Sequence, residues 1–82
     1  MSEADKLFEE LGYKKDFSIT YEFMISQHQF QVSFNSVDKN YNIKEYYYDK
    51  NGNFNSKEYD INDTSPELKQ AIQMKCKELG WI

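Results

Sequence analysis

The most reactive side chains in this chain are its single histidine, His28, and its single cysteine, Cys76. A histidine can act as a general base or bind a metal, and a cysteine can act as a nucleophile, but each role needs partner side chains. No second His or Cys lies at ligand spacing. We therefore expect His28 to be exposed in a hairpin turn and Cys76 to pack in the core. A lone cysteine also indicates a reducing compartment, since it cannot form an internal disulfide.

Four carboxylates, Asp49, Glu58, Asp60 and Asp63, lie in the second half of the chain. The segment that starts at Asp49 is superficially like a calcium loop, but Gly52 takes its fourth position and Asp60 its twelfth, where an EF-hand needs Gly at position six and Glu at twelve. We interpret the segment as a hairpin. A small-ligand or enzyme site here would require a concave pocket near Asp60 and Asp63. Because no phosphate loop, nucleophile elbow or metal box occurs, we predict neither enzymatic activity nor a cofactor.

An aromatic group in the third predicted strand and the strand after it is the strongest candidate for binding. Alternation along the strands points Tyr46, Tyr48 and Phe54 away from the helices, with Lys44, Glu58 and Asp60 at the border. Scattered exposed rings need no explanation, but adjacent ones often mark interfaces. We predict a partner-binding surface composed of Tyr46, Tyr48, Phe54, Lys44 and Glu58.

Two amphipathic helices are expected to support this sheet. The first covers residues 2–11, with Ser2 as N-cap, and an apolar stripe runs along one side of it. Gly12 is the expected left-handed residue after the helix, which places Tyr13 against Phe8 or its neighbours. The second helix begins with a capping box between Thr64 and Glu67 and ends at Gly80 and Trp81. Its predicted buried stripe is Leu68, Ala71, Ile72, Cys76 and Leu79.

Strict alternation predicts two strands, at residues 17–25 and 29–35. A turn at Gln27-His28 would set Ile25 opposite Phe30, Phe23 opposite Val32 and Tyr21 opposite Phe34.

Two further strands, at residues 41–48 and 53–61, flank a turn that contains Asn51-Gly52. A two-residue loop would set Glu45 opposite Glu58, whereas a three-residue loop sets Glu45 opposite Lys57. We favour the second register because opposite charges and apolar residues then face each other. Its other pairs are Tyr48 with Phe54, Lys44 with Glu58, Ile43 with Tyr59 and Tyr41 with Ile61. The expected fold is thus α+β in the order α-β-β-β-β-α, a four-stranded antiparallel meander with both helices packed on one face.

Composition limits the function further. The 82 residues form one domain with a net charge of −4, and they include ten lysines but no arginine. This balance argues against nucleic-acid binding, which depends on cationic contacts to phosphate. No apolar run approaches the length of a membrane span, and the polar N-terminus is unlike a signal peptide, so we expect a cytoplasmic protein that does not enter membranes.

Both ends of the chain carry a signature. The first part of the signature is Leu7-Phe8-Glu9-Glu10-Leu11-Gly12-Tyr13. The second is a helix that begins with Thr64-Ser65-Pro66-Glu67-Leu68 and ends with Glu78-Leu79-Gly80-Trp81. Together they resemble a family of small uncharacterised phage and prophage proteins of low-GC Gram-positive bacteria. The resemblance covers about a third of the chain and consists of helix caps and stripes. It implies a host-cell cytoplasmic location and transfers no functional residue.

From these observations we expect a small phage-type accessory protein that binds a protein partner, such as a host protein. The alternative is a structural or homo-oligomeric component that uses the aromatic sheet face or a sheet edge. A small-ligand site or an enzyme ranks third.

Overall fold

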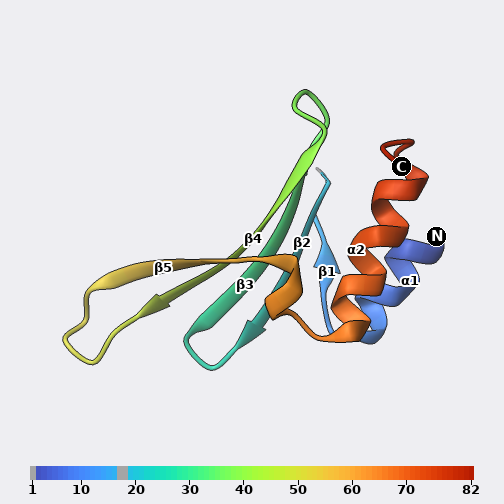
Figure 1. Cartoon of the computed structure of the whole chain (residues 1–82). Helices are drawn as coiled ribbons and strands as arrows, with labels where there is room; N and C mark the ends of the chain where they lie inside the picture. The colour runs from blue at the N-terminus through green and yellow to red at the C-terminus, as the bar shows by residue number, and fades with distance from the viewer. Residues whose placement is uncertain (1, 17–18) are drawn as a thin grey trace.

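The protein is described by a computed structural model that covers residues 2–16 and 19–82. The described residues form an α+β fold with a five-stranded antiparallel sheet in the order β1-β2-β3-β4-β5 (Figure 1). The predicted start of the first long strand at Phe17 lies outside the described residues. In chain order the elements are α1 (Glu3–Glu10), β1 (Lys14–Lys15), β2 (Thr20–Ile25), β3 (His28–Asn35), β4 (Asn40–Tyr48), β5 (Phe54–Tyr59), the 3₁₀ turn η1 (Ile61–Asp63) and α2 (Pro66–Glu78).

The prediction of four strands was wrong because β1 was missed. Lys14 and Lys15 pair with Glu22 and Tyr21 of β2. Two consecutive lysines carry no alternation of apolar and polar residues, so the periodic signal that identified the other strands is absent here. The backbone pairs because the chain turns back along β2 directly after α1.

Helix α1 begins and ends as predicted. The Ser2 hydroxyl accepts a hydrogen bond from the Asp5 N–H at 3.1 Å, which makes Ser2 the N-cap. At the other end Gly12 has a φ of +92°, and the Tyr13 N–H donates to the Phe8 carbonyl at 3.0 Å. This is a Schellman ending. It brings the ring of Tyr13 edge-on to that of Phe8, with centroids 5.7 Å apart.

Helix α2 has the predicted ending but a different cap. Trp81 donates its N–H to the Cys76 carbonyl at 2.9 Å, and Gly80 has a φ of +77°. The N-cap is Ser65, whose hydroxyl accepts from the Leu68 N–H at 3.1 Å. The predicted capping box from Thr64 was wrong because the Thr64 hydroxyl instead donates to the Ile61 carbonyl at 2.6 Å and closes η1.

The predicted register between β2 and β3 was wrong by two residues. The turn is Ser26-Gln27 rather than Gln27-His28, with a φ of +54° at Ser26. The structure therefore pairs Phe23 with Phe30 and Tyr21 with Val32. A slip of two residues keeps every side chain on its face of the sheet, so the apolar pattern alone cannot distinguish the two registers.

The register between β4 and β5 follows the three-residue loop. Tyr48 lies opposite Phe54, and Glu45 lies opposite Lys57. Gly52 is left-handed with a φ of +80°, and the Asp49 carboxylate accepts the N–H groups of Asn51 and Asn53, each at 2.9 Å. The remaining predicted pair, Tyr41 with Ile61, was wrong because β5 ends at Tyr59 and η1 follows. The other two predicted pairs are present, Lys44 with Glu58 and Ile43 with Tyr59.

The core contains side chains of α1 and α2 and of the sheet face that carries Tyr21, Val32 and Ile43, which we call the inner face. Its largest fully buried side chains are Phe8 of α1, Tyr21 of β2, Val32 of β3 and Ile72 of α2. The rings of Phe8 and Tyr21 stack with centroids 3.9 Å apart. The molecule is elongated, 43 × 26 × 26 Å, and the tip of the β4–β5 hairpin projects away from both helices (Figure 1). Part of the sheet is therefore left without a helix above it.

Candidate functional site

The predicted aromatic group forms a real cluster on the side of the sheet opposite the core, which we call the outer face. The rings of Tyr46 and Phe54 stack with centroids 5.9 Å apart and an interplanar angle of 8°. The ring centroid of Tyr48 lies 5.4 Å from that of Phe54. Tyr48 is 59% exposed and Phe54 60% exposed. These three side chains, the aromatic cluster, thus present adjacent apolar rings to solvent at the end of the molecule away from the helices.

Beside the aromatic cluster, a row of polar residues crosses the outer face. Glu22, Gln31, Lys44 and Glu58 lie opposite one another in register on β2 to β5. The Gln31 amide donates to the Glu22 carboxylate at 3.4 Å. The row places Lys44 between an amide and a carboxylate, beside the rings. Asp60, expected at this border, instead accepts the Asn62 N–H at 2.9 Å and caps η1.

The inner face carries a second group that the sequence did not indicate. Glu45 is 8% exposed, and its carboxylate pairs with the His28 ring nitrogen Nδ1. The Tyr59 hydroxyl donates to the other carboxylate oxygen at 2.6 Å. The His28 ring stacks on Tyr47 with centroids 5.5 Å apart. The expectation that His28 lies in the turn was wrong, because it is the first residue of β3; its side chain is 44% exposed.

The partners of Glu45 favour its charged form. The hydrogen bond from Tyr59, followed by the bond to His28 and its charge, lowers the pKa of Glu45 below its usual 4.5 against the opposing effect of burial. The same bond raises the pKa of Tyr59 to about 12. A histidine held by a carboxylate can act as a base or metal ligand through its other nitrogen. Among residues 2–16 and 19–82, however, no three His, Cys, Asp or Glu side chains are placed to hold a metal.

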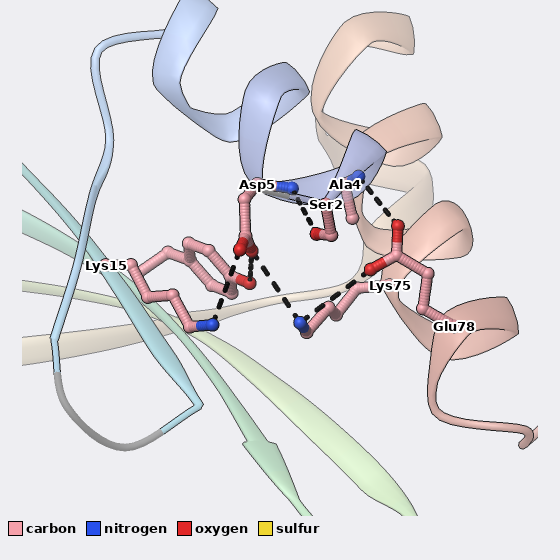
Figure 2. Close-up of polar contacts among 7 residues, drawn as sticks. Ser2, Ala4, Asp5, Lys15, Lys75 and Glu78 are labelled. Carbon is pink, nitrogen blue, oxygen red and sulfur yellow. Dashed lines mark hydrogen bonds and ion pairs between the residues drawn. The ribbon is translucent and has the colours of Figure 1, made fainter.

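A third polar group joins the two helices to the sheet (Figure 2). The Asp5 carboxylate accepts a hydrogen bond from the Tyr21 hydroxyl and one from Lys15 at 3.4 Å. Lys75 is a buried residue of α2, and its Nζ lies 3.6 Å from the Asp5 Oδ1 and 3.9 Å from the Glu78 Oε1. The network therefore connects α1, α2, β1 and β2 at one point.

Electrostatics in this network favour an ionised Asp5. Burial opposes the charge, but the Tyr21 hydrogen bond and the charges of Lys75 and Lys15 outweigh it and hold the pKa of Asp5 below its usual 3.8. Burial and the Asp5 carboxylate raise the pKa of Tyr21 strongly. Because every member is paired, the geometry is that of a structural connection. The sequence signal for it was weak: Lys75 lies beside Cys76 on the apolar side of α2.

Two neighbouring hollows lie between the ends of the helices and the inner face. The first has a volume of about 250 Å³, and the second about 200 Å³. They share four lining residues and form one trough. We call this the apolar trough; its first hollow is lined by Leu11, Tyr13, Phe23, Phe30, Ser65 and Leu68, and its second by Tyr13, Phe30, Ile43, Tyr59, Asp63, Thr64, Ser65 and Leu68. A concave site next to Asp63 therefore exists, as the third-ranked hypothesis of a ligand site requires.

Cys76 has the predicted role in packing. It is 7% exposed and belongs to the core beside Ile72. Burial raises the pKa of its thiol, which disfavours the reactive thiolate.

Comparison with models of known protein families, with characterised proteins and with solved structures finds no match to this chain. Within the described residues, no helix combines the length and apolar character needed to cross a membrane.

Proposed function

We propose that this protein is a small phage-type accessory protein that binds a protein partner through the aromatic cluster on its outer face. The observation that carries the proposal is the contiguity of Tyr46, Tyr48 and Phe54, two of which are more than half exposed. Adjacent exposed aromatic rings are enriched at protein interfaces, where they bury large areas at low entropic cost.

In this proposal both helices cover the inner face and leave the outer face open. Lys44 and Glu58 flank the rings and would form the polar rim of the interface. The net charge of −4 favours a partner with a basic surface, because complementary charge increases the association rate. The same charge, with no arginine in the chain, disfavours nucleic acid. A host protein in the bacterial cytoplasm fits these properties and the resemblance to phage proteins.

The test is an affinity pull-down from a lysate of a low-GC Gram-positive bacterium. Wild type is compared with a Tyr46→Ser/Tyr48→Ser double variant, which removes two rings but leaves the core intact. The matched control is Val37→Ser/Ile82→Ser, which removes exposed apolar side chains, 90% and 80% exposed, outside the cluster. We expect one protein to be captured by wild type and control but lost with the double variant. Equal capture by all three would contradict the proposal.

A second candidate function is self-association through the edge of the sheet. β5 is an edge strand of six residues: one of its edges pairs with β4, and no strand of the described residues pairs with the other edge. A second copy paired antiparallel about Ser56 would set Lys57 opposite Asn55 and Glu58 opposite Phe54, so that no like charges meet. Light scattering coupled to size exclusion separates the candidates, since a monomer at high concentration would rule out the self-associating form.

A further inference from the structure

The apolar trough has two chemically different ends. Its first hollow is walled by side chains with large apolar surfaces, among them Phe23, Phe30 and Leu68. Its second hollow adds three oxygen-bearing side chains, Tyr59, Asp63 and Thr64. A ligand that fills the trough would therefore have an apolar body and one polar group.

Two hydroxyl groups at the polar end, those of Thr64 and Tyr59, already donate hydrogen bonds within the protein. Thr64 donates to the Ile61 carbonyl at 2.6 Å, and Tyr59 donates to Glu45 at 2.6 Å. A hydroxyl that donates in this way can still accept a hydrogen bond through its oxygen. Both groups therefore face a ligand as acceptors.

Asp63 adds a negative charge to these acceptors. It is exposed, and its carboxylate has no hydrogen bond or ion pair with any residue in the described part of the chain. An ionised carboxylate only accepts hydrogen bonds. The polar end of the trough thus matches a group that donates several hydrogen bonds and carries positive charge.

The start of α2 does not reverse this preference. A helix N-terminus attracts anions through free N–H groups. Here Pro66 has no N–H, the Leu68 N–H is bonded to the Ser65 hydroxyl at 3.1 Å, and the Lys69 N–H is bonded to the Ser65 carbonyl at 3.0 Å, which leaves the N–H of Glu67. Glu67 in the first turn further offsets the positive end of the helix.

We infer that the apolar trough binds a ligand with an aromatic or branched apolar body and a cationic nitrogen, with the nitrogen between Asp63, Thr64 and Tyr59. The class is an arylalkyl ammonium ion. This site is on the inner face, so it is independent of the aromatic cluster and of the proposed function.

The experiment titrates ¹⁵N-labelled protein with three probes of similar shape and different charge: the phenethylammonium ion, 2-phenylethanol and phenylacetate. Amide chemical shifts report where each probe binds. We expect saturable shifts at Tyr13, Thr64 and Leu68, and phenethylammonium binding about threefold to tenfold more tightly than 2-phenylethanol, as expected for a partly exposed charged contact. Phenylacetate should bind most weakly.

Two variants and a control make the test specific. Asp63→Asn should reduce phenethylammonium affinity to that of 2-phenylethanol and leave the alcohol unchanged. Glu3→Gln changes the net charge equally at an exposed position in the first turn of α1 and should alter none of the three affinities. Leu68→Trp should fill the trough and abolish all shifts.

Three results would overturn the inference: no saturable shift with any probe, tighter binding of phenylacetate than of phenethylammonium, or equal effects of Asp63→Asn and Glu3→Gln. If Leu68→Trp does not fold, the comparison of Asp63→Asn with Glu3→Gln still decides the outcome.

Discussion

The Glu78 carboxylate, in the last turn of α2, accepts a hydrogen bond from the Ala4 backbone N–H at 2.9 Å, so one helix end caps the start of the other (Figure 2). Ala4 is in the first turn of α1, where backbone N–H groups have no partner within the helix. The negative charge of Glu78 also lies at the positive end of the α1 dipole. A contact between residues 74 positions apart thus ties the two ends of the chain together.

This relationship predicts that Glu78→Ala destabilises the protein by about 1 kcal/mol, the usual effect of removing a cap. The variant also removes the ion pair to Lys75. Glu9→Ala, at an exposed position of α1, is the control and should change the free energy of unfolding by less than about 0.5 kcal/mol. Urea unfolding followed by circular dichroism measures both. An equal effect of the two variants would mean that the cap contributes nothing.

Gly12 and Gly80, the residues that follow the two helices, predict different costs for the same substitution. Gly12 and Gly80 both adopt left-handed backbone, with φ of +92° and +77°. A Cβ at Gly12 would lie 2.8 Å from the Phe23 ring, whereas one at Gly80 meets nothing within 4 Å. We expect Gly80→Ala to cost about 1–2 kcal/mol for the backbone conformation, and Gly12→Ala to cost about 1 kcal/mol more because the Phe23 ring must move. Equal losses in denaturant unfolding would show that the ring yields freely.

The free energy of unfolding should fall in acid because the fold holds two carboxyl groups, Asp5 and Glu45, in their charged form. The folded-state pKa of Asp5 and of Glu45 lies below the ordinary values of 3.8 and 4.5. A carboxyl of this kind contributes stability that is fully present above its unfolded pKa and is lost as the pH falls through its folded pKa. The free energy of unfolding should therefore be flat near neutral pH and decline below pH 4.5.

Asp5→Asn and Glu45→Gln test the assignment of this decline. Each variant should be less stable than wild type at neutral pH and should lose less stability on acidification. Asp60→Asn is the comparison, because that variant keeps a side-chain oxygen able to accept the Asn62 N–H. A decline in acid that is unchanged in both test variants would assign it to other groups.

The features of the fold that were predicted correctly are those set by residues close together in the sequence. The endings at Gly12 and Gly80 were predicted because a left-handed residue and the bonds around it are set within a few positions of sequence. The β4–β5 register was predicted because the Gly52 turn and the charges of Glu45 and Lys57 agree. The β2–β3 register was not, since its turn lacks glycine and a slip of two residues preserves both faces.

Some features of the candidate sites could likewise be predicted from the sequence, and others could not. The aromatic cluster follows from strand alternation and one register, so Tyr46, Tyr48 and Phe54 could be placed together from the sequence. Alternation also places Glu45 on the face of Ile43, a signal that could have marked it as a buried carboxylate in need of partners. The apolar trough could not be predicted, because it depends on where the helices stop relative to the sheet.

Replacement of an aromatic residue by serine should lower the free energy of unfolding more on the inner face of the sheet than on the outer face. Phe23 lies on the inner face, half-buried, with its ring centroid 5.4 Å from that of Tyr13 and 6.2 Å from that of Phe30, and Phe23→Ser should destabilise the protein by about 2 kcal/mol. Tyr48 on the outer face is 59% exposed, so Tyr48→Ser should change the free energy of unfolding by less than about 1 kcal/mol. Thermal melting of the two variants beside wild type gives the comparison. Equal losses would mean that Tyr48 supports the fold, and its ring would then be an unsuitable anchor for a partner.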